Sequence, residues 1–465
     1  MQTPLSPEQQ LNTIKKAAWR LLPLMVASYL VAYIDRSNVS FAALTMNKDI
    51  GLSAYWYGWG AGIFFIGYAL CEVPSNMVLQ RTSARLWIAR IMVTWGVISA
   101  AMALVQGPTS FLVLRFMLGV AEAGFFPGIL FYLTRWFPAM WRARAIAILY
   151  LAVPVSNAVA SVISSAILEM NGTLGLRGWQ WVFILEALPA ILLAFGVLRW
   201  MTERPAEASW LTRAERDWLE GEIAAERSLT QAHGVRGLWR AVGDTRVLLL
   251  TAIYTTGVTA SYGVVFFMPQ IVKGLGLSNL ATGLVTAIPY VFGTISLVLW
   301  GISSDRRNER RWHLIVSTGL VAVGLGLAGL TSHSYWAVVA MALAAIGIYG
   351  SRPSFWPIPS TILTGAEAAI GLAFINSIGN LGGYVGPLVV GTIKDKTGSF
   401  EMALYFLSAC ALLSTIISLA AVRSTRNPVD AAGGAGGRDG RARPSPAGVL
   451  DGGPQAALRS GPEHM

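Results

Sequence analysis

Charged residues, cysteine and histidine are all scarce in this sequence. Only 13% of its 465 residues are charged and 54% are hydrophobic, whereas soluble domains carry roughly 25% charged residues. The two cysteines, Cys71 and Cys410, both lie in apolar segments, so we expect neither a disulfide framework nor a Cys/His metal cluster. The composition therefore excludes an ordinary soluble domain and indicates a protein that crosses the membrane several times.

Sequence signatures of catalysis are missing as well. No P-loop, HExxH motif or nucleophile elbow occurs in a suitable context. The four histidines, at positions 233, 313, 333 and 464, fall in loops, at span edges or in the tail. We therefore expect no enzyme, no metal and no cofactor. The polar stretch from Met1 to Trp19 lacks a short apolar region followed by a cleavage site, so we expect no removable signal peptide.

Long apolar segments, by contrast, are abundant. Six of them precede the only long hydrophilic connection, Thr202 to Asp244, and six follow it. The sequence therefore predicts an all-α membrane protein with twelve transmembrane helices in two six-helix bundles, an organisation typical of transporters built from two repeats. The expected spans lie near residues 18–41, 54–75, 87–106, 109–133, 144–169, 179–201, 246–272, 281–302, 312–331, 335–363, 370–393 and 401–422.

The segments outside the spans define the remaining parts of the chain. Within the linker, Thr212 and Glu215 have the spacing of a capping box that opens a short amphipathic helix. The C-terminal segment is rich in Gly, Pro, Ala and Arg, which predicts disorder. The expected parts are a cytoplasmic N-terminus (1–17), an N-terminal bundle (18–201), a cytoplasmic linker (202–245), a C-terminal bundle (246–422) and a disordered cytoplasmic tail (423–465).

Basic residues are distributed unevenly between the two ends of the expected bundles. The net charge is +11, and most Lys and Arg residues lie in the termini, the linker and the loops on the same side. By the positive-inside rule this asymmetry predicts that both termini are cytoplasmic, so the basic balance reflects topology and we expect no nucleic-acid partner. The loops on the opposite side hold only Lys48, Arg177, Lys273, Lys394 and Lys396.

Two charged residues interrupt the first span. Asp35 and Arg36 lie well inside an apolar segment, where a charge costs roughly 2.5–3.5 kcal/mol on insertion scales. Adjacent positions on a helix point about 100° apart, so this helix offers an acid and a base to different neighbours. The alternative is a mutually neutralising pair that only packs the bundle.

The fourth span carries a second acid and a second base. Arg115 and Glu122 are seven residues apart and therefore lie on one helical face, within about 20° of each other. Since a guanidinium binds a carboxylate in a bidentate manner, Arg36 and Arg115 suit anion capture. Asp35 and Glu122 suit proton uptake, because an anion bound to the neighbouring arginine removes a charge that favours their ionised form. A static ion-pair network remains the alternative.

Further polar residues lie at unusual places in the spans. Prolines at positions 353, 357 and 359 break the tenth span, and broken helices expose backbone dipoles where substrates bind. Ser354 and Trp356 in that break are therefore candidate pocket residues. Tyr68 is a candidate hydroxyl donor or a packing residue, and Arg352 a second anion anchor or a residue at the cavity edge. Glu72 is either a third titrating site or a helix-packing residue, and the same alternatives stay open for Glu186.

Several motifs together resemble a known family. The loop motif Gly-x-x-x-Asp-Arg at 301–306 resembles a signature of the major facilitator superfamily, although Asn76 and Gln80 replace the expected Gly and Asp in the equivalent loop of the first half. Longer stretches are similar to its anion:cation symporter family. These are YIDRSNVS (33–40), GYALCEVPSN (67–76), RFMLGVAEAGFFPG (115–128), GWQWVFILE (178–186), FWPIPS (355–360) and NSIGNLGGYVGP (376–387).

The resemblance implies a fold, an activity and site residues. It implies the major facilitator fold in a bacterial inner membrane, acting as a monomer by alternating access. In that family the residues matching Arg36 and Arg115 bind the substrate anion, those matching Asp35 and Glu122 are linked to protonation, and the one matching Asn376 contacts substrate. The implied activity is proton-coupled uptake of a small organic anion.

The substrate stays open among several classes. Tartrate or another sugar acid suits the arginines, whereas Tyr33, Tyr68, Phe355 and Trp356 would also stack on an aromatic carboxylate of the phthalate or hydroxyphenylacetate type. A drug efflux carrier fits the buried arginines poorly. A membrane sensor that binds the anion without moving it lacks a sizeable soluble output domain in this sequence.

Overall fold

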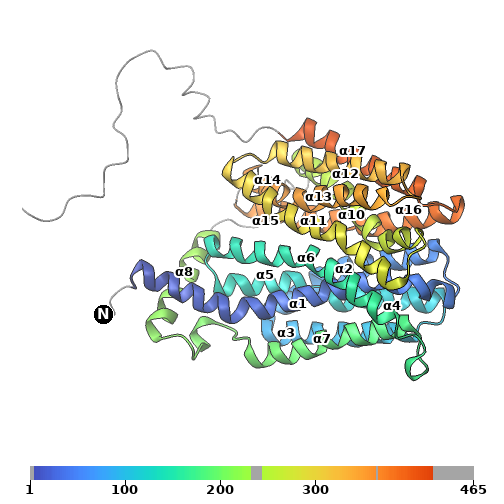
Figure 1. The fold of residues 1–465 in the computed structure, drawn as a ribbon. Helices are drawn as coiled ribbons and strands as arrows, with labels where there is room; N and C mark the ends of the chain where they lie inside the picture. The colour runs from blue at the N-terminus through green and yellow to red at the C-terminus, as the bar shows by residue number, and fades with distance from the viewer. Residues whose placement is uncertain (1–4, 232–242, 363–364, 423–465) are drawn as a thin grey trace, which may run out of the picture. The chain divides into compact units, whose positions relative to one another are not determined.

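The computed structural model describes residues 5–231, 243–362 and 365–422. All regular structure in these ranges is helical, which confirms the predicted all-α class. Figure 1 shows the helices of the first half (blue to green) beside those of the second half (yellow to red). The predicted disordered tail, 423–465, lies outside the described residues.

The first half contains seven long helices, because its fourth expected span is divided. Short 3₁₀ turns, η1 (Met102–Leu104), η2 (Thr173–Gly175) and η3 (Pro205–Glu207), follow α3, α6 and α7. The helices are α1 (Pro7–Asp49), α2 (Ala54–Arg81), α3 (Ala84–Ala101), α4 (Pro108–Glu122), α5 (Phe125–Trp136), α6 (Ala139–Leu168) and α7 (Gly178–Trp200).

The second half follows a helix in the linker, α8 (Arg213–Gln231), and is also broken at two spans. The predicted break at the prolines is confirmed, since one helix ends at Phe355 and the next begins at Pro357. The helices are α10 (Thr245–Lys273), α11 (Asn279–Arg306), α12 (Arg311–Leu330), α13 (Trp336–Phe355), α14 (Pro357–Ile362), α15 (Gly365–Asn380), α16 (Gly382–Thr397) and α17 (Glu401–Ala421).

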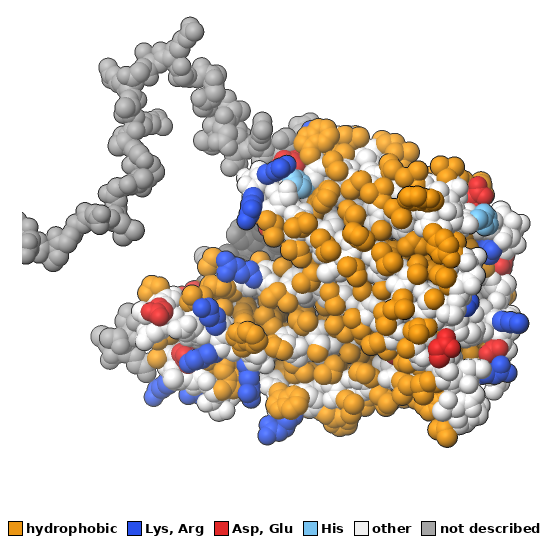
Figure 2. All heavy atoms as spheres, viewed as in Figure 1, with side chains coloured by type: hydrophobic (Ala, Val, Ile, Leu, Met, Phe, Trp, Pro, Cys, Tyr) orange, Lys and Arg blue, Asp and Glu red, His pale blue; other side chains and the backbone are white. Residues whose placement is uncertain are grey.

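Eleven helical segments in the described residues are long and apolar enough to cross a membrane. The expected span near 370–393 is missing from this set because it is divided at Leu381 into two helices of 16 residues each. The count of twelve spans therefore stays a prediction. The orange surface across the middle of Figure 2 and the Lys and Arg side chains gathered at the end near α8 fit a bilayer-spanning bundle with one basic end.

The linker is attached to the first half by ion pairs. Lys16 Nζ lies 2.5 Å from Glu215 Oε1, and Arg142 Nη2 lies 2.5 Å from Glu226 Oε1. Thr212 and Glu215 form the predicted capping box, with Thr212 N donating to Glu215 Oε2 at 2.8 Å and Glu215 N to Thr212 Oγ1 at 3.3 Å. The described part of the linker is therefore packed against the first half by these ion pairs.

Glu203 ties the start of this linker to the N-terminus of α3. Its carboxylate accepts hydrogen bonds from Ser83 Oγ and from the backbone N–H groups of Ala84 and Arg85, and pairs with Arg135. Partial burial opposes ionisation of Glu203, but these donors and the guanidinium outweigh it and lower the pKa of the carboxyl. The contact therefore weakens only at acidic pH, as the carboxyl protonates.

The two halves are joined firmly at the end where α2 begins. The carboxylate of Asp395, on α16, accepts hydrogen bonds from the backbone N–H groups of Ala54 and Tyr55, both at 2.9 Å. A Cβ added at Gly58 would lie 2.3 Å from the carbonyl oxygen of Pro387, so only glycine permits this approach. The start of α2 is thus capped by a side chain from the opposite half, which holds the two halves together at this point.

We predict that Asp395→Ala weakens the contact between the two halves at the start of α2. The substitution leaves two N–H groups of α2 without their acceptor, which costs about 1 kcal/mol. Spin labels on Glu169 and Lys396, one in each half, should show a larger population of long distances by double electron–electron resonance. Asp49→Ala is the matched control, because Asp49 accepts from Arg177 and Trp179 within the first half. Equal distance distributions in the wild type and Asp395→Ala would contradict the prediction.

Candidate functional site: a central polar cavity

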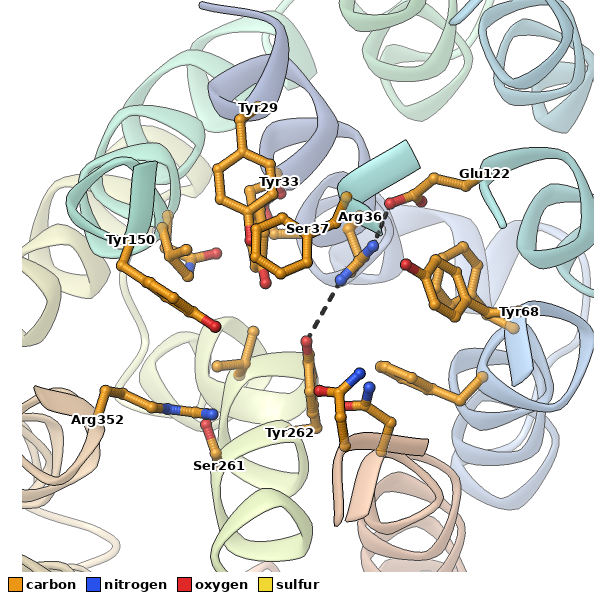
Figure 3. Close-up of a pocket in the computed structure, with 18 of the residues that line it drawn as sticks. Tyr29, Tyr33, Arg36, Ser37, Tyr68, Glu122, Tyr150, Ser261, Tyr262 and Arg352 are labelled. Carbon is orange, nitrogen blue, oxygen red and sulfur yellow. Dashed lines mark hydrogen bonds and ion pairs between the residues drawn. The ribbon is translucent and has the colours of Figure 1, made fainter. Parts of the chain in front are cut away.

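A cavity of about 100 Å³ lies between the two halves. Figure 3 shows side chains of both halves around one space, with Arg36 on one side and Arg352 on another. Aromatic rings form most of the wall, and the charged, amide and serine side chains come from several helices of both halves. The lining includes Tyr29, Tyr33, Arg36, Ser37, Phe64, Phe65, Tyr68, Glu122, Tyr150, Asn157, Tyr254, Tyr262, Tyr349, Arg352, Asn376 and Asn380.

Arg36 is the cation of the first half at this cavity. It forms an ion pair with Glu122 of α4, and its Nη1 lies 3.5 Å from the hydroxyl of Tyr262. Its guanidinium carbon lies 4.9 Å from the ring centroid of Tyr33 and 5.7 Å from that of Tyr68. Aromatic faces stabilise a cation without neutralising it, so the countercharge of Arg36 in this structure comes from Glu122 and not from the rings.

A break between α4 and α5 presents Glu122 to Arg36. The sequence predicted a span near 109–133, and within it α4 ends at Glu122 and Gly124 has φ 87°. A Cβ added at Gly124 would lie 2.2 Å from Ser75 Oγ, and few residues other than glycine adopt this φ. Pro108–Trp136 as a whole is still one segment long and apolar enough to cross a membrane, with a helix break at a left-handed glycine inside it.

Arg352 is the cation of the second half. Its Nη1 donates to the hydroxyl of Tyr254 at 3.3 Å, and its side chain lines the same cavity as Arg36. Asn157 of the first half donates to the hydroxyl of Tyr349 of the second at 3.1 Å. The cavity thus presents two guanidiniums from opposite halves together with several hydroxyl and amide groups.

Four of the predicted site residues lie at the cavity and four lie outside its wall. Arg36, Tyr68, Glu122 and Asn376 line it. Asp35 is buried between helices of the first half, where it accepts a hydrogen bond from Ser99. Arg115, Ser354 and Trp356 are not among the lining residues. Asn380, one helical turn after Asn376, also lines the cavity.

Arg115 uses its guanidinium on the backbone of α2. It is fully buried, and its Nε and Nη2 lie 3.1 and 3.3 Å from the carbonyl oxygens of Gly60 and Ala61. Its guanidinium carbon lies 5.2 Å from the ring centroid of Phe64, a residue that lines the cavity, whereas Arg115 itself does not. A direct contact between Arg115 and substrate therefore needs a rearrangement of α2 or α4, and stays a prediction.

Sequence reasoning missed most of the tyrosines at the cavity. Tyr150, Tyr254, Tyr262 and Tyr349 come from three helices that are distant in the sequence. The available signal was a tyrosine hydroxyl in an apolar helix, which needs a partner when it is buried. Within the described residues no group of three His, Cys, Asp or Glu side chains has the arrangement of a metal site.

We predict that Arg115→Lys lowers thermal stability more than Arg36→Lys does. Lysine cannot reproduce both contacts with the α2 carbonyls, and hydrogen bonds to charged groups contribute about 1.5–3 kcal/mol. Scanning calorimetry of the purified variants measures the melting temperature, and titration calorimetry on the folded protein measures anion affinity. An unchanged melting temperature with lost affinity in Arg115→Lys would contradict this assignment and support direct substrate contact.

Comparison with protein families and relatives agrees with this architecture. The family model described as Major Facilitator Superfamily matches residues 25–387 and 258–457. Two proteins of Agrobacterium vitis named "Putative tartrate transporter" are each 46% identical, over 90% of this chain and 93% and 97% of their own. A protein of Acinetobacter baumannii named "Quinolone resistance transporter" is 41% identical, over 88% of this chain and 94% of its own.

Solved structures with this fold are also transporters. The inward open conformation of the xylose transporter XylE from E. coli matches with a TM-score of 0.71 at 15% identity, covering 88% of this chain and 97% of that one. The family relationship confirms that the protein is a transporter and not an enzyme. The chain, a multi-pass membrane protein with two joined helical halves around a polar cavity, belongs to the Major Facilitator Superfamily.

Proposed function

We propose that the protein imports a small organic anion together with protons, by alternating access. One observation carries the proposal: guanidiniums from both halves, Arg36 and Arg352, line a single cavity. A cation in each half lets one anionic substrate bridge the halves, so that binding is coupled to their relative movement. Most of the remaining lining groups are aromatic or neutral and polar.

The polar groups of the cavity favour a hydroxylated dicarboxylate, such as tartrate or a related sugar acid. Each guanidinium offers a planar fork to a carboxylate, and the amides of Asn157 and Asn376 suit substrate hydroxyls. The two tartrate transporter relatives support this class. An aromatic carboxylate is the alternative, because tyrosine and phenylalanine rings surround the same space.

The ion pair between Arg36 and Glu122 offers a mechanism for proton coupling. A substrate carboxylate that binds Arg36 competes with Glu122 for the same guanidinium. Glu122, almost fully buried, would then lose its countercharge, and binding a proton would remove the cost of the unpaired charge. Substrate and proton would therefore bind together, with Asp35 as the second proton-linked acid of the first half.

Alternating access requires two states of the bundle, one closed at the outer end and one closed at the inner end. The contacts around Asp395 close one end, which we assign to the outside because the opposite end carries the linker and most basic residues. In this state substrate would be released toward the cytoplasm. We place the protein in the bacterial inner membrane with both termini inside, acting as a monomer with twelve spans, as the family resemblance implies.

Export of a drug is the second candidate. The quinolone resistance relative, 41% identical, and the aromatic cavity wall favour it. The two candidates differ in what they need from Arg352, because a zwitterionic or neutral drug does not require a second buried cation. Measuring binding of L-tartrate, phthalate, hydroxyphenylacetate and a fluoroquinolone by thermal shift and titration calorimetry separates them. Binding of the fluoroquinolone alone would overturn the anion proposal.

We predict that Arg36→Lys and Arg352→Lys each abolish most uptake of the bound anion in proteoliposomes. Lysine keeps the charge but loses the planar fork that holds a carboxylate through two hydrogen bonds. The loss should be about tenfold or more for each variant, since a charged hydrogen bond contributes about 1.5–3 kcal/mol. Arg199→Lys, on an exposed position of α7, is the matched control. Normal uptake by both cavity variants would refute the proposed anion contacts.

We predict that an inward pH gradient accelerates uptake, and that Asp35→Asn and Glu122→Gln lose this acceleration. Neither amide binds a proton in the range where a carboxyl does, whereas exchange of labelled for unlabelled substrate needs no net proton release. Both variants should therefore retain counterflow. A sodium requirement with no response to the pH gradient in the wild type would rule out proton coupling.

A further inference from the structure

A second buried acid of the first half, Glu186, interacts with Asp35. Glu186 of α7 and Asp35 of α1 are 4% and 1% exposed, and neither lines the cavity. Helix α7 packs against α1, α3 and α6. The side chains that interact with Glu186 are Ser164 from α6, and Asp35 and Asn38 from α1.

The hydrogen bonds of the two acids leave one oxygen free on each. Ser164 Oγ donates to Glu186 Oε1 at 2.6 Å, and Ser99 Oγ and Asn38 Nδ2 both donate to Asp35 Oδ1. The second oxygens, Asp35 Oδ2 and Glu186 Oε2, are buried and have no hydrogen-bond partner. A proton could therefore bind either free oxygen without breaking an existing hydrogen bond.

No salt bridge to either acid is formed within the described part of the chain. The charged groups that act on Asp35 from a distance are Arg115, whose guanidinium is bound to α2 carbonyls, and Glu122. Two neighbouring buried carboxylates without an ion pair are unfavourable when both are ionised. A single shared proton removes most of this cost.

We propose that Glu186 holds a proton that it exchanges with Asp35, as a second member of the proton path in the first half. The step converts a carboxylic acid at Glu186 and a carboxylate at Asp35 into a carboxylate at Glu186 and a carboxylic acid at Asp35, so the charge of the pair is constant. Asn38 donates to Asp35 at 3.3 Å and also interacts with Glu186, so it links the two acids. The inference rests on the proposed proton coupling and extends it to a residue that never meets substrate.

The arrangement of α1 connects this pair to the cavity. Asp35 belongs to the buried pair inside the first half. The next residue, Arg36, faces the cavity and binds Glu122. A proton on Asp35 changes the charge next to the Arg36–Glu122 pair. The protonation state of the buried acids therefore changes the electrostatic potential at the anion site. Glu186 is therefore a positioning residue for protons, acting through Asp35.

The variant Glu186→Gln tests the proposal in proteoliposomes. Glutamine keeps an oxygen for the Ser164 hydroxyl but cannot hold the exchangeable proton. Acceleration of uptake by an inward pH gradient should fall about tenfold or more, while counterflow and the melting temperature stay close to wild type. Adding Glu186→Gln to Asp35→Asn should produce no further loss, because the two acids act as one unit. Glu401→Gln, at the start of α17, is the matched control.

The outcomes separate this inference from the proposed function. A wild type without any gradient response refutes proton coupling itself, and the role of Glu186 with it. A normal gradient response in Glu186→Gln refutes only the role of Glu186, and so does a parallel loss of counterflow, which would indicate a packing role.

If Glu186→Gln does not fold, a second variant and a spectroscopic measurement test the proposal instead. In Glu186→Asp, which keeps an acid, the gradient response should be retained in part. The infrared carbonyl band of a protonated buried carboxyl should also shift relative to wild type. The absence of any such band that responds to Glu186→Asp would overturn the proposal.

Discussion

The ion pair between Arg36 and Glu122 is the interaction on which the site depends. A buried ion pair contributes little net stability, since the cost of removing both charges from water offsets their attraction. Breaking it without replacement, however, leaves an unpaired buried charge. In the proposed mechanism the pair exchanges partners: an incoming carboxylate on Arg36 and a proton on Glu122 together restore neutrality. The aromatic rings around Arg36 hold the guanidinium in place during that exchange.

Helix α1 serves two environments because adjacent residues point in different directions. Arg36 and Tyr33 face the cavity, whereas Asp35 and Asn38 face α3 and α7 within the first half. Proton-linked acids can thus lie behind the anion site without contact with substrate. In the second half, Arg352 supplies charge at the cavity. In the proposed mechanism, this division lets substrate contact both halves while the acids of the first half bind the protons.

The sequence predicted the architecture more completely than the site. Hydrophobic length and the single polar linker placed nearly every helix, because burial in a bilayer requires continuous apolar segments. The predicted span at 109–133 is present as one apolar segment, but the helix break inside it at the left-handed Gly124 was not predicted. Arg36 and Glu122 could be predicted as site residues because each is a charged residue inside an apolar span. Arg115 lies outside the cavity wall because backbone carbonyls of α2 take its guanidinium, a contact that no sequence pattern reveals. The same is true of tyrosines brought together from distant helices.

The central claim is that anion and proton move together, and the reverse measurement tests it most directly. Proteoliposomes with a pH-sensitive dye inside are placed in a high external concentration of L-tartrate with no initial pH gradient. Because coupling between two ligands is reciprocal, inward movement of the anion should carry protons with it and acidify the interior, in the wild type but not in protein-free vesicles. Tartrate accumulation without any change of internal pH would contradict the account.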